Sequence, residues 1–172
     1  MLKLIGMIFV IGSFTGIGIA QRQQYQGRVS TLRSLLSALD LIAGELSFRL
    51  TSIPDIIALL ANDRHSSVSE LFSNMNRAVQ QDNGLSLTYK WMKTFQQHGP
   101  QFGLKADDIA VLCDMSDFIG KYDVKSQEQS VQYARQRLEQ QLKLAEAELK
   151  NKGTVYRTCC IAAGLLLVLV LL

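Results

Sequence analysis

The sequence predicts an all-α protein, a membrane-tethered bundle of about six helices with a hydrophobic transmembrane helix at each end. Apolar residues recur at helical spacing through the middle of the chain, and no long run alternates between apolar and polar residues as a half-buried strand would. Nearly all the charge lies in that middle, whereas both ends are apolar. We therefore expect a membrane helix at 1–20, a soluble helical bundle at 21–154 and a second membrane helix at 155–172.

The composition excludes several classes of protein. The chain has 172 residues, enough for one domain of ordinary size. Between residues 21 and 157, 17 Lys and Arg face 15 Asp and Glu, so the basic residues are almost matched by acids. This balance argues against a nucleic-acid binder, and the 48% of apolar residues argues against a disordered chain. The three cysteines form no disulfide framework, because two of them are adjacent.

The first apolar segment, Leu4 to Ala20, is just long enough to cross a bilayer, which takes about 20 helical residues. Gly12 and Gly16 have the spacing that lets two membrane helices approach closely, so they are candidates for transmembrane packing. A cleaved signal peptide is the alternative. Lys3 would supply its positive end, and small residues precede Gln21 where a signal peptidase would cut.

The second apolar segment, Val155 to Leu172, would extend about 27 Å as a helix. Tyr156 and Arg157 at its start are typical of a membrane interface. Basic residues flank the inner ends of both segments: Arg22, Arg28, Arg33, Lys143, Lys150, Lys152 and Arg157. The positive-inside rule therefore places the middle domain in the cytoplasm.

Heptad spacing predicts the first helix of the middle domain. Its apolar stripe steps by three and four residues through Val29, Leu32, Leu36, Leu39, Ala43, Leu46 and Leu50. Ser52 and Asp55, with Pro54 between them, form a capping box that begins a short second helix. Ser67 and Glu70 have the same spacing and predict the start of a third helix, which Gly84 and its neighbours would end.

The remaining elements are also predicted to be helical. The fourth helix would bury Tyr89, Met92 and Phe95 and stop before Gly99, and the fifth would begin at Asp107 or Asp108. The sixth, from about residue 125 to 152, would bury one stripe and carry charges on its other face. Its buried stripe would be Val131, Ala134, Leu138, Leu142, Ala145 and Leu149. We expect the first and sixth helices to pack antiparallel, because each joins a predicted membrane span.

Acidic residues concentrate on the fifth helix and just after it. The candidates for docking a basic partner are Asp107, Asp114 and Asp117, and Asp108 and Asp123 belong to the same group. A solvated face with acids at a helix N-terminus is the alternative. No nucleotide loop, metal-ligand spacing or nucleophile–histidine pair is present, so we expect no enzyme activity, no cofactor, no bound metal and no small-molecule substrate.

Several segments, taken in their order along the chain, carry a resemblance to a known family. They are the start at residues 1–6, the Glu45-Leu46 and Pro54 stretch, the segment from Leu112 to Asp123 with Gly120, then Gln129, and the ending from Lys152 to Leu172. Together they resemble the stage III sporulation protein AB family. The resemblance covers essentially the whole chain. It implies a helical domain similar to the cytoplasmic domain of the type II secretion F and type IV pilus C platform proteins.

The resemblance also implies a role. We expect a platform or assembly subunit of the channel that connects mother cell and forespore, in the mother-cell membrane around the forespore. Its partners would be other sporulation channel membrane proteins, a cytoplasmic secretion-type ATPase and the lipid bilayer. The alternative is an exported helical binding or sensor module, anchored by its C-terminal segment after signal cleavage. Whether residues 1–20 are retained distinguishes the two hypotheses.

Overall fold

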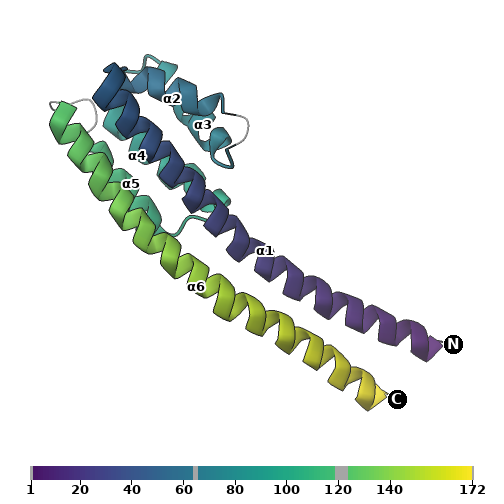
Figure 1. Ribbon diagram of the computed structural model, residues 1–172. Helices are drawn as coiled ribbons and strands as arrows, with labels where there is room; N and C mark the ends of the chain where they lie inside the picture. The colour runs from purple at the N-terminus through teal and green to yellow at the C-terminus, as the bar shows by residue number, and fades with distance from the viewer. Residues whose placement is uncertain (1, 64–65, 119–123, 172) are drawn as a thin grey trace. The chain divides into compact units, whose positions relative to one another are not determined.

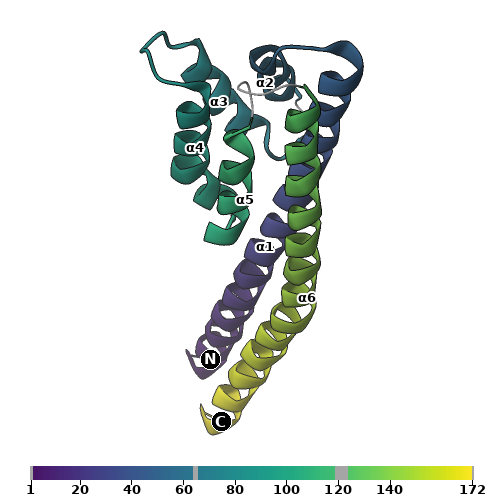
Figure 2. The same cartoon turned by 90° about the vertical axis from the view of Figure 1, so that its left-hand side faces the viewer.

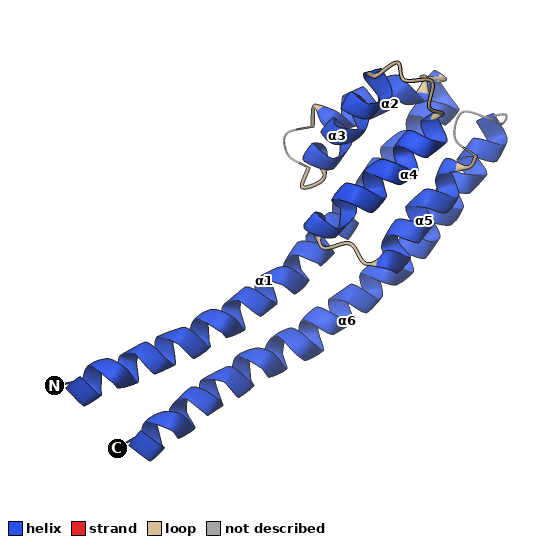
Figure 3. Cartoon of the chain, turned by 180° about the vertical axis from the view of Figure 1, so that it is seen from behind, coloured by secondary structure: helices blue, strands red, loops and turns tan. Residues whose placement is uncertain are grey.

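The structure, a computed structural model, describes residues 2–63, 66–118 and 124–171, without the side chains of 2–21, 124, 152–157, 159–161 and 163–171. Every regular element in these ranges is a helix and none is a strand, which confirms the predicted all-α class (Figures 1 and 3). The α-helices are α1 (Leu2–Gly44), α2 (Ile53–Ala61), α3 (Ser69–Gln80), α4 (Leu87–His98), α5 (Ala106–Ser116) and α6 (Val124–Leu171). A short π-helix, η1 (Glu45–Arg49), follows α1, and a 3₁₀ turn, η2 (Gly99–Phe102), follows α4.

The chain separates into two compact units, of which residues 1–29 and 144–172 form the first. Within this unit an ion pair joins α1 to α6. Nη1 of the buried Arg28 lies 3.2 Å from Oε2 of the partly exposed Glu148. Gly12 and Gly16, the candidates for transmembrane packing, lie outside the residues whose surroundings are described. Within the part of the chain that the structure describes, no helix is both long and apolar enough to cross a membrane.

Residues 30–143 form the second unit, in which α1 and α6 run antiparallel side by side (Figures 1 and 2). A hydrogen bond of 2.5 Å from Arg135 Nε to Asp40 Oδ1 joins them. Arg135 also contacts Glu139 at 2.9 Å, so charged residues pair on α6, one face of which was predicted to carry charges. The predicted antiparallel packing of the first and sixth helices is therefore found within this unit.

The buried stripe of α1 differs from the predicted one. Leu36 and Ala43 are only half-buried, and Leu50 is 71% exposed. Val29, Leu32, Leu39 and Leu46 are buried as predicted, and Leu35, Ala38 and Ile42 are buried in addition. This stripe is wider than a heptad seam because α1 has neighbours on more than one side. In the second unit it contacts α6 through Asp40, and its Thr31 hydroxyl donates to the Phe102 carbonyl in η2 at 2.8 Å.

The start of α2 is where the sequence predicts it. Ser52 is the N-cap residue and Pro54 lies in the first turn, where a missing N–H costs no hydrogen bond. The reciprocal capping box is absent, because the Ser52 hydroxyl donates to the Asp55 carboxylate instead of accepting a backbone N–H. Ile56, Ile57 and Leu60 are buried, as a short amphipathic helix requires.

The predicted capping box of α3 is wrong. The helix begins at Ser69 with Val68 as its N-cap residue, two residues after the predicted serine. Ser67 reaches α1, where its hydroxyl lies 2.9 Å from the hydroxyl of Ser34. The Ser67 hydroxyl, predicted from local sequence to cap α3, therefore contacts α1 instead.

Three aromatic side chains form the centre of the second unit. Phe72 of α3 meets Trp91 and Phe95 of α4 edge to face, with both pairs of ring centroids 6.3 Å apart. All three are at most 2% exposed. Trp91 does not belong to the predicted apolar face of α4, whereas Tyr89, which does, is 47% exposed. Figure 2 shows α3, α4 and α5 beside one another, and this packing positions α5.

Candidate functional site

The inner side of α5 is fixed to α4 by hydrogen bonds to the helix backbone. The Trp91 indole N–H donates to the Leu112 carbonyl at 2.9 Å, and the Thr88 hydroxyl donates to the Ser116 carbonyl at 3.1 Å. Both contacts are buried, so they hold the helix along much of its length. The opposite side of α5 is left for solvent and for α6.

The acidic residues of α5 divide into two groups. Asp108 is completely buried, and its carboxylate accepts the Lys105 backbone N–H at 2.8 Å, which caps the helix N-terminus. Asp107, Asp114 and Asp117, the candidate docking residues, are all exposed. Asp123 lies outside the described residues. The second group therefore places three carboxylates on the outer side of α5 and at its C-terminal end.

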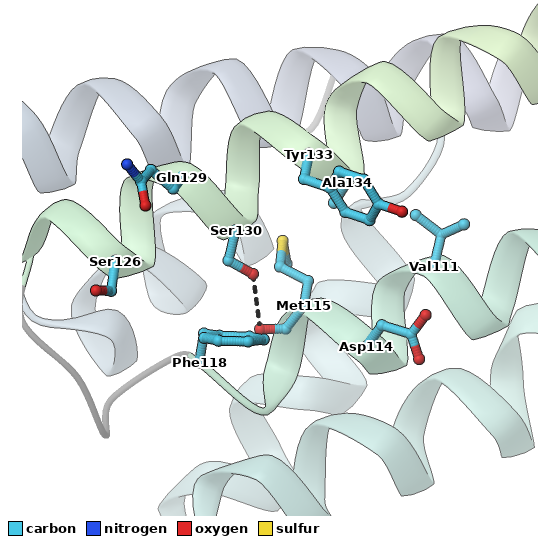
Figure 4. A pocket seen from close by; sticks show the side chains of 9 residues that line it. All are labelled: Val111, Asp114, Met115, Phe118, Ser126, Gln129, Ser130, Tyr133 and Ala134. Atoms are coloured by element: carbon cyan, nitrogen blue, oxygen red, sulfur yellow. Dashed lines mark hydrogen bonds between the residues drawn. The ribbon is translucent and has the colours of Figure 1, made fainter.

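A groove of about 350 Å³ lies between α5 and α6 (Figure 4). The segment from α5 contributes Val111, Asp114, Met115 and Phe118, and α6 contributes Ser126, Gln129, Ser130, Tyr133 and Ala134. We call this the α5–α6 groove. Val111, Met115 and Ala134 are buried and give it an apolar floor, while the rings of Phe118 and Tyr133 are 44% and 60% exposed. A hydrogen bond of 3.4 Å from Ser130 to the Met115 carbonyl crosses it (Figure 4).

The rim of the α5–α6 groove carries a charged pair. Arg137 Nη1 lies 3.3 Å from Asp114 Oδ2, and the guanidinium carbon lies 5.8 Å from the centre of the Tyr133 ring. Both side chains of the pair are largely exposed, and such pairs contribute about 0–1 kcal/mol. The arginine therefore occupies a position that a basic group from another molecule can also take.

The surroundings of Cys113 change the pKa of its thiol. Burial raises its pKa, and the carboxylates of Asp114 and Asp117 raise it further. A thiol with a raised pKa stays protonated at neutral pH and is a poor nucleophile. The raised pKa of Cys113 therefore reflects its burial first and the two nearby carboxylates second.

The sequence singled out acidic residues beside this groove and did not single out its apolar lining. Asp114 lines the groove. Asp117, three residues later in the sequence, and Asp107 are not among its lining residues. α5 ends at Ser116, so Phe118 lies beyond the end of the helix and is 44% exposed. On α6, Tyr133 and Ser130 fall among polar residues, and no local signal marks them as a groove wall. In the part of the chain that the structure describes, no cluster of His, Cys, Asp or Glu could hold a metal ion.

Three comparisons with known proteins give the same family description. The profile of the family "Stage III sporulation protein AB" matches residues 3–172. A curated relative of the same name from Bacillus subtilis (strain 168) is 27% identical over 173 residues, and the match covers 100% of both chains. A solved structure of "Stage III sporulation protein AB (SpoIIIAB)" has a similar fold, with a TM-score of 0.64 at 23% sequence identity. The match covers 72% of this chain and 96% of that chain.

Proposed function

Since the chain belongs to the stage III sporulation protein AB family, we propose that it is a non-enzymatic platform subunit of the channel complex between mother cell and forespore. In this role it docks a cytoplasmic secretion-type ATPase and contacts other membrane proteins of the complex. Family membership supports a role in sporulation. The docking function is supported by the geometry of α5 and α6.

The observation that carries the docking function is the α5–α6 groove with its acidic rim. Exposed aromatic rings beside a buried apolar floor are typical of protein-binding surfaces, because they provide contact area with little conformational entropy to lose. Asp114 and Asp117 provide charge that favours a basic partner. We propose that an apolar side chain of the ATPase enters the groove and that a neighbouring Lys or Arg pairs with Asp114.

The Asp114–Arg137 pair gives this proposal a specific consequence. In the free protein Arg137 neutralises part of the acidic rim, so a basic residue of the partner must displace it. The exchange of one exposed pair for another is nearly neutral in free energy, and the apolar contact in the groove then supplies most of the affinity. Charge on the rim acts mainly on the rate and selectivity of docking.

The proposed setting is the mother-cell membrane around the forespore, with residues 1–20 and 155–172 as membrane helices and 21–154 in the cytoplasm. The apolar ends and the basic residues beside them support this topology. The exported module with a cleaved signal peptide is the alternative. The intact mass of the purified membrane protein distinguishes them, because retention of residues 1–20 is required by the platform and excluded by the exported module.

A photo-crosslinking experiment tests the docking site. Tyr133 is replaced by a benzoylphenylalanine residue in cells that sporulate with this chain as the only copy of the protein. We expect a covalent adduct with the secretion-type ATPase, lost when Asp114→Lys and Asp117→Lys are combined. The control combines Glu70→Lys and Asp82→Lys, two exposed acids elsewhere in the second unit, and should keep the adduct.

A second variant acts in the opposite direction. Arg137→Gln frees the Asp114 carboxylate, so affinity for the purified ATPase should rise by up to about fivefold, the equivalent of about 1 kcal/mol. Isothermal titration measures it. An adduct that persists in the Asp114 and Asp117 double variant, together with an unchanged affinity in Arg137→Gln, would place the ATPase elsewhere on the protein.

A further inference from the structure

A second groove lies between α3 and α4 and shares no lining residue with the α5–α6 groove. Its volume is about 180 Å³. We call it the α3–α4 groove. The side chains that can donate hydrogen bonds into it include those of Asn74, Tyr89, Lys90, Lys93, Gln97 and His98. Among the described residues that line it, none is an aspartate or a glutamate, so its polar lining favours an anion.

A buried cation forms part of the lining. Lys90 is only 9% exposed, and its ammonium group donates to the Gln81 carbonyl at 2.6 Å and to the Val79 carbonyl at 3.3 Å. These carbonyls lie at the C-terminal end of α3, where the helix dipole is negative. An ammonium group has three N–H donors, so two carbonyls leave one for a further acceptor. Among the described residues no carboxylate forms an ion pair with Lys90, whose ammonium group contacts backbone carbonyls.

A second cation lies at the mouth of the groove. Lys93 is exposed, one helical turn after Lys90, and its Nζ lies 5.9 Å from the centre of the Tyr89 ring. An anion that enters between these groups meets both ammonium groups and the neighbouring amides. The groove also has an apolar side, made by Ala78 and by Leu85, which is 43% exposed. A carboxylate on a short aliphatic stem matches both parts, because its stem can contact the apolar side chains.

We propose that the α3–α4 groove binds a glutamate-bearing acidic segment of a partner protein, with the carboxylate between Lys90 and Lys93. Charge complementarity carries this assignment: the lining offers two ammonium groups, amide donors and no acid. The second unit then presents two docking surfaces that favour partners of opposite charge. The α5–α6 groove takes a basic partner and the α3–α4 groove an acidic one, so two different partners can bind one copy of the chain.

The test uses the full chain in an uncharged maltoside detergent and a fluorescein-labelled hexaglutamate peptide as the probe. Fluorescence anisotropy at low salt measures binding, since exposed charges are screened at high salt. Lys93→Glu should weaken binding at least about tenfold, because it places a like charge beside the carboxylate. Lys143→Glu makes the same change of net charge at an exposed lysine of α6, outside the groove, and should leave the affinity within about twofold.

Three other results would overturn the proposal. The first is no binding of hexaglutamate to the unmodified chain, and the second is an equal loss in Lys93→Glu and Lys143→Glu, which would indicate attraction by net charge alone. The third is a Lys93-dependent binding to phosphatidylglycerol vesicles, or a Lys93-dependent self-association, without binding of hexaglutamate. That result would assign the groove to a lipid surface or to a second copy of the chain. A melting temperature that is unchanged in Lys93→Glu excludes unfolding as the cause.

Discussion

Replacing Leu35 by alanine should destabilise the bundle far more than the same replacement of its neighbour Leu36. Leu35 is 1% exposed, whereas Leu36 is only half-buried, although both lie on the same helix and lose the same atoms. A Leu→Ala change at a fully buried site costs about 2–5 kcal/mol, because the lost burial is followed by a cavity that the neighbours fill incompletely. At a half-buried site solvent and flexible side chains fill the space, and we expect about 1 kcal/mol.

Thermal unfolding, followed by circular dichroism at the helix band, measures this difference. In a chain of 172 residues a loss of 1 kcal/mol lowers the melting temperature by about 2–4 °C. A loss of about 3 kcal/mol at Leu35 should therefore lower it by about 6–12 °C, against about 2–4 °C at Leu36. Equal shifts, or a larger one for Leu36→Ala, would refute the packing of α1 and favour the heptad stripe.

Three further predictions concern the rest of the molecule. The first uses a chain whose other two cysteines are replaced by serine. There Asp114→Asn should lower the pKa of Cys113, so the pH midpoint of its alkylation by iodoacetamide should fall. An unchanged midpoint would contradict the electrostatic effect of Asp114 on the thiol. Glu148→Gln should lower the free energy of unfolding, measured by urea denaturation, by about 1–3 kcal/mol, because the buried Arg28 loses a charged partner. A change below experimental error would show that the ion pair does not contribute to stability. Residues 21–152 expressed alone should be soluble and at least about 60% helical by circular dichroism, whereas a β signature would contradict the bundle.

Local sequence was sufficient to predict the helices because their signals act over a few residues. Apolar spacing predicts that the middle of the chain is helical, and the backbone constraints of glycine and proline stop α4 at His98, as expected. Ser52 at the start of α2 follows from the same local chemistry. The exposure of Asp107 and Asp114 was also predictable, since a helix with apolar residues on one side leaves other residues on the opposite side. Asp108, grouped with them from the sequence, is buried and caps the helix.

Tertiary structure decided which side of each helix is buried and where the grooves lie. The heptad stripe of α1 assumes one partner helix, but contacts from α6 and η2 on different sides bury Leu35 and leave Leu36 half-exposed. Ser67 has the sequence spacing of a helix N-cap, yet its hydroxyl bonds to that of Ser34, because the packing places α1 within hydrogen-bond distance. A groove is a property of two elements together. The spacing of residues along one helix predicts its own faces, and only the packing of the helices determines which of those faces meet and what is left open between them.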